Sequence, residues 1–196
     1  DAIVEASGLL KAVAVGCSKI ASDIRLMGCG PRCGIGELKI PAVQPGSSIM
    51  PGKVNPVICE SMMMVCCQVI GNDASLTTAG LGGIGGLLDL SVAMPVMASN
   101  ILQSINLLAN ASTMFVENLL DGLEADEARC KSLIEGSLAL CTSLAPVIGY
   151  DKASALAKQA FKEGKTVREV ATEQKILPAE ELDRLLDPMS MTEPQA

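Results

Sequence analysis

Three long apolar segments in the first part of the chain predict three long helices. Residues 1–27 contain no proline and are rich in Ala and Leu on more than one face, as expected of a helix buried on most sides. Residues 56–79 continue in the same way, and residues 89–120 place Pro95 near their start. Because polar and apolar side chains are poorly separated on these helices, we expect them to bury surface against other chains.

Segments rich in glycine and proline separate the predicted helices. Residues 28–56 carry a Gly or Pro every few positions, so we expect a long irregular connection, and such connections are usually functional. Asn55 is expected to cap the second helix, with Pro56 in its first turn. Residues 80–86 are expected to join two helices. They include a GxGxxG string, but this string follows a helix and not a strand, which disfavours dinucleotide binding.

The remaining residues have the pattern of short, solvated helices. Asp151 is expected to cap a helix that ends at Gly164, and Pro178 is expected to open the last helix. Thr166 and Glu169 have the spacing of a capping box, in which each residue satisfies a backbone N–H of the other. The sequence therefore predicts an all-α protein.

Charge and composition add a domain boundary and exclude several functions. Hydrophobic residues make up 49% of the 196 residues and charged residues 19%, which excludes intrinsic disorder. Charged residues are sparse through residue 120 and dense after it, so we expect a buried helical domain over 1–120 and a small helical domain over 121–196. The net charge of −7 disfavours nucleic-acid binding, and no apolar run approaches the roughly 18 residues of a membrane span.

The supply of reactive side chains is also limited. The chain has no His, which removes the usual general base and most zinc sites, so proton chemistry must use Ser, Lys, Tyr, Cys or carboxylates. The eight cysteines form no CxxC pair, and we interpret them as reduced core residues of an intracellular protein. The chain starts without a Met or a signal-peptide pattern, so we expect no signal peptide, and we expect a fragment of a longer protein.

The densest chemical signal lies at residues 45–56, PGSSIMPGKVNP. It gathers two hydroxyls, an ammonium group and an amide before a helix N-terminus, which suits a ligand that carries a carboxylate. The spacing differs from a phosphate loop, because five residues separate Gly46 from Gly52 and Val54 follows Lys53. A serine oxygen held among N–H donors near Lys53 would be stabilised as an alkoxide able to remove a carbon-bound proton. An ordinary loop with serine turns would use the same residues.

The string GSSIMPGKVNP resembles the signature of the fumarase/aspartase superfamily. Further strings resemble class II fumarases, and together they extend over essentially the whole chain. These strings are KIASDIR (19–25), GPRCGIGE (30–37), CE (59–60), CQVIGND (67–73), LQSI (102–105) and IGYDKA (148–153).

The resemblance implies an enzyme that reversibly adds water to fumarate to give L-malate, without a metal or an organic cofactor. It implies a long-helix bundle with a small helical C-terminal domain, assembled as a homotetramer whose active sites each combine segments of three chains. Ser47 is then the base that removes the Cβ proton to give an aci-carboxylate. Lys53, Asn55 and Ser48 are then the substrate-binding residues. Lys53 and Asn55 bind the substrate carboxylate, and Ser48 helps to shape the loop.

This chain resembles only the C-terminal portion of such enzymes, so the missing N-terminal portion is an expected partner. The expected location is the cytoplasm, or the mitochondrial matrix in a eukaryote. Two alternatives remain open. Aspartate ammonia-lyase belongs to the same superfamily, and the strings QPG (44–46) and LDPMSMT (186–192) also resemble it. The second alternative is a non-catalytic assembly subunit, because Asp89 occupies a position at which fumarases typically carry Glu.

Overall fold

The computed structural model describes residues 1–192 and is mostly helical, which confirms the all-α prediction. The chain divides into two compact units, Asp1–Ala125 and Asp126–Ala196. The last four positions of the predicted C-terminal domain, 193–196, lie outside the described residues. Each unit has its own hydrophobic core, and each is described separately below.

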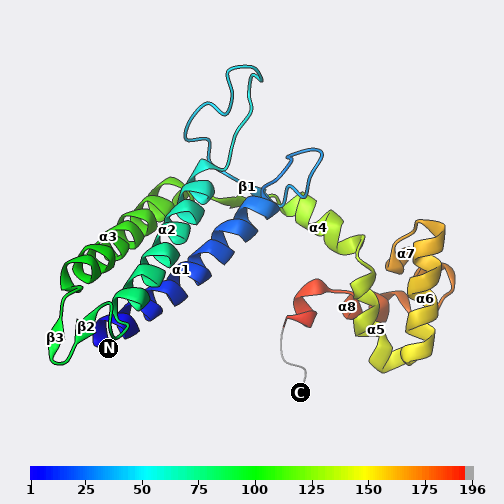
Figure 1. The fold of residues 1–196 in the computed structure, drawn as a ribbon. Helices are drawn as coiled ribbons and strands as arrows, with labels where there is room; N and C mark the ends of the chain where they lie inside the picture. Colours follow the sequence, from blue (N-terminus) through cyan, green and yellow to red (C-terminus); the bar gives the residue numbers. More distant parts are fainter. Residues whose placement is uncertain (193–196) are drawn as a thin grey trace. The chain divides into compact units, whose positions relative to one another are not determined.

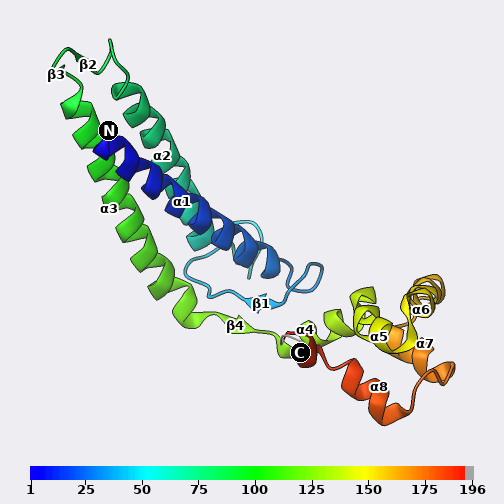
Figure 2. The same cartoon turned by 90° about the horizontal axis from the view of Figure 1, so that it is seen from below.

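The first unit is built on three long helices that lie along one another (Figures 1 and 2). They are α1 (Ala2–Met27), α2 (Val57–Ala79) and α3 (Met94–Asn118). Helix α2 packs against both of the others. Ala14 and Ala21 of α1 and Ala111 of α3 are buried in the shared core, where their small side chains allow the helices to approach closely. The first two helices begin and end within a residue or so of the prediction.

The third helix begins later than predicted because a hairpin occupies its expected first turn. Strands β2 (Gly86–Leu87) and β3 (Leu90–Ser91) pair antiparallel. The N–H groups of Val92 and Ala93 then both donate to the Gly85 carbonyl oxygen, at 2.8 and 3.3 Å. These N–H groups are thus satisfied by the connector, and α3 starts at Met94 with Pro95 in its first turn as predicted.

Gly85 is required by close backbone packing in this connector. A Cβ at Gly85 would lie 1.5 Å from the Ala79 carbonyl oxygen, whereas a Cβ at Gly82 would meet nothing within 4 Å. We therefore expect Gly85→Ala to lower the free energy of unfolding by about 1–3 kcal/mol or more. Gly82→Ala should change it by less than about 0.5 kcal/mol. Urea denaturation of both variants measures the difference, and equal effects would contradict this packing.

Polar side chains cross the helix interfaces as two buried clusters. Between α1 and α2, the Ser7 hydroxyl donates to Asp73 Oδ1 at 2.8 Å, and Lys11 Nζ lies 2.5 Å from Asp73 Oδ2. Between α2 and α3, Asn72 Nδ2 donates to Gln103 Oε1 at 2.9 Å and to Ser104 Oγ at 3.0 Å. Such directional bonds favour a single register of the three helices, because a shifted helix would leave buried polar groups without partners.

The Asp73 carboxylate makes the free energy of unfolding depend on pH. The hydrogen bond from Lys11 and that from Ser7 lower the pKa of Asp73 below its ordinary value, against the opposing effect of burial. Because its pKa is lowered by folding, the ionised Asp73 stabilises the fold at pH values above its unfolded-state pKa of about 3.9. This contribution is lost as the pH falls through the folded-state pKa. We expect Asp73→Asn to cost about 1–2 kcal/mol at pH 7, since Lys11 is partly screened by solvent.

The measurement is urea denaturation of the wild-type chain and of Asp73→Asn between pH 7 and pH 3. The difference in free energy of unfolding should be constant near neutral pH and should shrink below about pH 4. A difference that stayed constant down to pH 3 would show that the ionised carboxylate does not provide the stability.

Large apolar side chains remain exposed on the outer surface of the three helices. They include Leu9, Val13 and Ile20 on α1, Met64 on α2 and Leu102 on α3. Burial of these side chains against other chains stays a prediction.

The second unit consists of short helices around its own core. They are α4 (Glu127–Glu135), α5 (Cys141–Ile148), α6 (Tyr150–Glu163), α7 (Val167–Glu173) and α8 (Ala179–Leu185), with 3-10 turns η2 (Leu138–Leu140) and η3 (Pro188–Met191). Gly164 ends α6 in the left-handed conformation, and Pro178 precedes α8, both as predicted. Asp151 does not cap α6, because Gly149, with a φ of 88°, turns the chain one residue before Tyr150 and starts the helix earlier.

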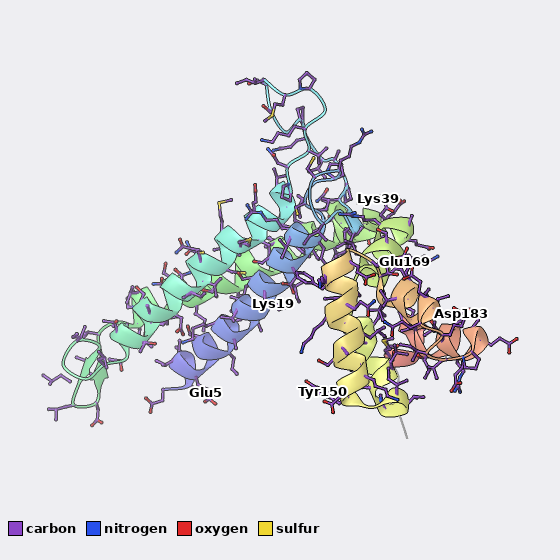
Figure 3. The ribbon with its side chains drawn as sticks, turned by 90° about the vertical axis from the view of Figure 1, so that its right-hand side faces the viewer. Glu5, Lys19, Lys39, Tyr150, Glu169 and Asp183 are labelled. Atoms are coloured by element: carbon purple, nitrogen blue, oxygen red, sulfur yellow. The ribbon has the colours of Figure 1, made fainter. Side chains whose placement is uncertain are left out.

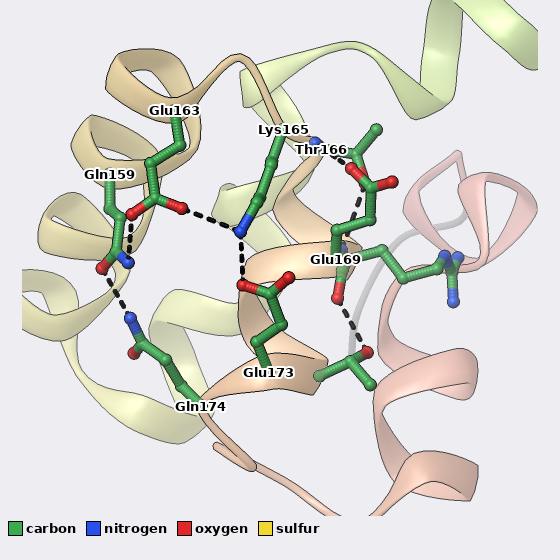
Figure 4. A network of polar contacts seen from close by, with 9 residues as sticks. Gln159, Glu163, Lys165, Thr166, Glu169, Glu173 and Gln174 are labelled. Atoms are coloured by element: carbon green, nitrogen blue, oxygen red, sulfur yellow. Dashed lines mark hydrogen bonds and ion pairs between the residues drawn. The ribbon is translucent and has the colours of Figure 1, made fainter.

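A polar network fixes the turn between α6 and α7 (Figure 4). Lys165 Nζ lies 3.0 Å from a carboxylate oxygen of Glu163 and 2.7 Å from one of Glu173. These contacts raise the pKa of Lys165, and the hydrogen bond from Lys165 lowers the pKa of Glu163. The predicted capping box is confirmed, with Thr166 and Glu169 each bonded to the backbone N–H of the other.

The cysteines are only partly the core residues that the sequence predicted. Cys59, Cys66 and Cys141 are buried, and burial raises the pKa of each thiol. Other thiols are exposed, namely those of Cys29, Cys33 and Cys67. Two of these three lie in the loop after α1 and the third lies on α2. The core interpretation was wrong for all three.

Within residues 1–192, no single helix has the length and apolar character needed to span a membrane. One bent pair of helices, Glu127–Glu135 with Leu138–Ile148, meets the criterion jointly on length and composition alone.

Candidate active site

The loop that joins α1 to α2 carries the predicted site residues. Its only strand, among the residues described, is β1 (Leu38–Lys39), which pairs antiparallel with β4 (Glu124–Ala125) just after the 3-10 turn η1 (Leu120–Gly122). This confirms a long irregular connection. In Figure 3 the loop extends beyond the end of the helices, and its side chains project from both of its arms.

Gly46 and Asn55 close the base of the loop, which we call the neck. The Gly46 N–H donates to the Lys53 carbonyl oxygen at 3.0 Å, and Asn55 Nδ2 donates to the Gly46 carbonyl oxygen at 2.6 Å. The prediction that Asn55 caps α2 is therefore wrong. Its side chain reaches back to Gly46, and Pro56 occupies the capping position without a side-chain hydrogen bond to the helix.

The two serines of the loop differ sharply in their surroundings. Ser47 is half-buried, and its Oγ accepts the N–H groups of Ile49 at 3.1 Å and Met50 at 3.3 Å. Ser48 is exposed, and its hydroxyl makes no hydrogen bond within residues 1–192. Because N–H donors stabilise an anionic oxygen more than a neutral one, the local geometry favours an alkoxide at Ser47 over one at Ser48.

Lys53 lies on the returning arm of the loop, and its carbonyl oxygen is part of the neck. Its side chain is exposed, and its ammonium forms no hydrogen bond or ion pair with any group in the described part of the chain. A hollow of about 410 Å³ lies between the two arms and is lined by Ser47, Lys53 and Gln44, among others. The structure thus brings Ser47, Lys53 and Asn55 to one end of the loop.

The hollow adds residues that the sequence pattern did not single out. Gln44 and Met50 line it beside the predicted residues. Nothing in the spacing of the motif marks either of them, because the hollow forms only when the neck brings the two arms together. Over residues 1–192, no group of three or more His, Cys, Asp or Glu side chains is placed to hold a metal ion.

Asp89 lies at the opposite end of the bundle from this loop. It occupies the exposed turn between β2 and β3, next to the start of α3. Helix α2 runs between the loop and the hairpin, and its 23 residues span about 34 Å. Asp89 therefore does not contribute to the Ser47 site of the same chain.

Comparison with known proteins places the chain. A family model described as "Lyase" matches residues 1–71, and one described as "Fumarase C C-terminus" matches residues 140–193. Fumarate hydratase class II 2 of Bradyrhizobium diazoefficiens is 51% identical over 194 residues, which are 99% of this chain and 40% of that protein. Mitochondrial fumarate hydratase 1 of Arabidopsis thaliana is also 51% identical, over 99% of this chain and 39% of the relative. The chain belongs to the class II fumarate hydratase family.

Solved structures agree with this membership in the class II fumarate hydratase family. A class II fumarase from Schistosoma mansoni superimposes with a TM-score of 0.90 at 37% sequence identity. The match covers 100% of this chain and 40% of the fumarase chain. The cobalt-bound structure titled fumarate lyase:delta crystallin from Brucella melitensis gives a TM-score of 0.91 at 50% identity, over 99% of this chain and 41% of its own. The chain thus spans about 40% of the length of these relatives and matches the C-terminal portion of the family.

Proposed function

We propose that this chain supplies the signature-loop part of the active site in an enzyme that reversibly hydrates fumarate to L-malate. The observation that carries the proposal is the environment of Ser47. Its Oγ accepts two backbone N–H groups, and Ser47 and Lys53 both line the hollow between the arms of the loop. A base strong enough to take a proton from carbon needs both features, because N–H donors and a nearby ammonium stabilise the serine alkoxide.

In the dehydration direction, Ser47 takes the Cβ proton of L-malate, and the electron pair left on carbon moves into the adjacent carboxylate as an aci-carboxylate. Lys53 supplies positive charge to that carboxylate, and Asn55 donates an amide hydrogen bond to it. Collapse of the aci-carboxylate forms the double bond and expels the hydroxyl group, which leaves as water after accepting a proton. The group that donates this last proton belongs to the N-terminal portion of the enzyme.

The proposal includes the assembly and the setting of the enzyme. We expect the chains to associate with one another, because large apolar side chains are exposed on the three long helices, and the family resemblance implies a homotetramer. No metal or organic cofactor takes part in the proposed reaction. The location is the cytoplasm, or the mitochondrial matrix in a eukaryote. The relatives named above are fumarate hydratases, which favours this reaction over ammonia release from aspartate.

The test is an assay of the complete enzyme, in which this chain is joined to the N-terminal portion of the family, with fumarate, L-malate and L-aspartate as separate substrates. We expect turnover of fumarate and malate only. The chain alone is expected to show no appreciable turnover. Turnover of aspartate alone would assign the aspartase reaction instead. A complete tetramer without either activity would assign the role of an assembly subunit.

A further inference from the structure

We infer that Gly46 and Asn55 form a clasp that positions Ser47 and Lys53 relative to each other, so that Asn55 supports the reaction through the loop as well as through the substrate. Asn55 is on this view a positioning residue in addition to a ligand of the carboxylate. The inference rests on the proposed function, in which Ser47 is the base.

Both polar groups of Gly46 are used in the neck. Its N–H donates to the Lys53 carbonyl oxygen, and its own carbonyl oxygen accepts from Asn55 Nδ2. The 2.6 Å bond from Asn55 is the shorter of the two. Gly46 is thereby held from two directions by the returning arm of the loop.

The neck lies directly beside the two reactive side chains. Ser47 follows Gly46 in sequence, and Lys53 carries the carbonyl oxygen that Gly46 binds. The other backbone bond across this part of the loop, from the Lys53 N–H to the Met50 carbonyl oxygen, is longer at 3.3 Å. Without the clasp, Ser47 and Lys53 would be linked only indirectly among the described residues, through the bonds of Ile49 and Met50 to Ser47 Oγ and this longer bond from Lys53 to Met50. A misplacement of about 1 Å between reacting groups can lower a rate about 10²-fold.

The Asn55 amide has enough hydrogen-bonding groups for both roles. An amide NH₂ has two donors, and only one of them is needed for the Gly46 carbonyl oxygen. The second donor is not needed for the neck and can bind a substrate carboxylate. A substrate that binds Asn55 would thus contact the same group that holds the neck closed.

Gly46 allows the clasp to be tested without removing any side chain that contacts substrate. A Cβ at Gly46 would lie 2.3 Å from the Lys53 carbonyl oxygen and 2.8 Å from the Lys53 carbonyl carbon. Both are backbone atoms, so Gly46→Ala must force the two arms apart. Gly82→Ala is the matched control, because its Cβ meets nothing within 4 Å.

The first experiment measures kcat and KM of the complete enzyme for Gly46→Ala, Asn55→Ala and the double variant. We expect Gly46→Ala to lower kcat about 10–10²-fold with a smaller change in KM. If Asn55 acts partly through the neck, the double variant should lose much less than the product of the two single losses in kcat. Losses that multiply fully, or a Gly46→Ala enzyme with the kcat of Gly82→Ala, would overturn the clasp.

The second experiment follows hydrogen exchange of the Gly46 amide in this chain. Asn55→Ala should speed that exchange at least tenfold, because the bond from Gly46 to Lys53 opens more often, and Gly82→Ala should leave it unchanged. Equal exchange in wild type and Asn55→Ala would overturn the inference. The proposed function fails separately, if Ser47→Ala keeps the wild-type kcat.

Discussion

Replacing Ser47 by Ala in the complete enzyme should lower kcat about 10²–10⁴-fold and change KM far less. The reason is that the Ser47 oxygen is proposed to take the carbon-bound proton, while the substrate carboxylates are held by other groups. The two N–H groups that point at Ser47 Oγ would then have no anion to stabilise. Steady-state assays with malate and with fumarate, at saturating and limiting substrate, separate kcat from KM.

Ser48 provides the internal control for this result. It has the same side chain one position further along the loop, but its hydroxyl is exposed and makes no hydrogen bond to any residue in 1–192. Ser48→Ala should therefore cause only a modest loss of kcat, of about threefold or less, because replacing an exposed side chain without partners usually has a small effect. Equal and small losses at both serines would show that the proton is taken by a group outside this chain.

The long helices could be predicted because their signals are local and strong. An apolar stretch without proline defines α1, and glycine and proline punctuation bounds α2. The capping box at Thr166 and the left-handed Gly164 were also predictable, since each depends on residues within one turn. The start of α3 was not. The hairpin before it depends on the Gly85 carbonyl oxygen accepting two N–H groups from residues beyond the hairpin, and no single-residue preference encodes that bond.

The sequence singles out candidate residues for the site but does not give their geometry. The string GSSIMPGKVNP identified Ser47, Lys53 and Asn55, and the structure places all three at one end of the loop. The pattern alone assigned Asn55 to a helix cap, which is the common role of an Asn before a helix. The actual partner is a carbonyl oxygen nine positions earlier, and it comes within reach only after the loop has folded back. Hydrogen bonds between distant parts of a loop are the information that sequence patterns lack.

The buried polar clusters show the same limit in the helices. The sequence presents Asn72, Asp73 and Gln103 as polar residues on otherwise apolar helices. Their structural role can be assigned only from the folded chain, in which Asp73 contacts Lys11, and Asn72 contacts Gln103 and Ser104, across the helix interfaces. Polar residues in apolar helices of this kind set register, in addition to any contact with other chains.

Replacing Lys53 by Met in the complete enzyme should affect both binding and rate, in contrast to Ser47→Ala. Lys53 carries an exposed ammonium that forms no hydrogen bond or ion pair with residues 1–192, so its charge stays available for a dicarboxylate. We expect kcat to fall about 10²–10³-fold, as for the loss of one group that stabilises a developing anion, and KM to rise about tenfold. Met keeps most of the length and apolar character of the side chain and removes only the charge.

Two further variants make this result specific. Lys53→Arg keeps the positive charge with a different shape, and should restore KM more than kcat, because binding needs charge whereas the transition state also needs the ammonium in one position. Lys158→Met removes an exposed charge from α6 in the second unit and should leave both constants unchanged. If Lys53→Met raised KM alone, Lys53 would bind the substrate equally in ground and transition states. Stabilisation of the aci-carboxylate would then have to come from other groups, and the catalytic part of its role would be wrong.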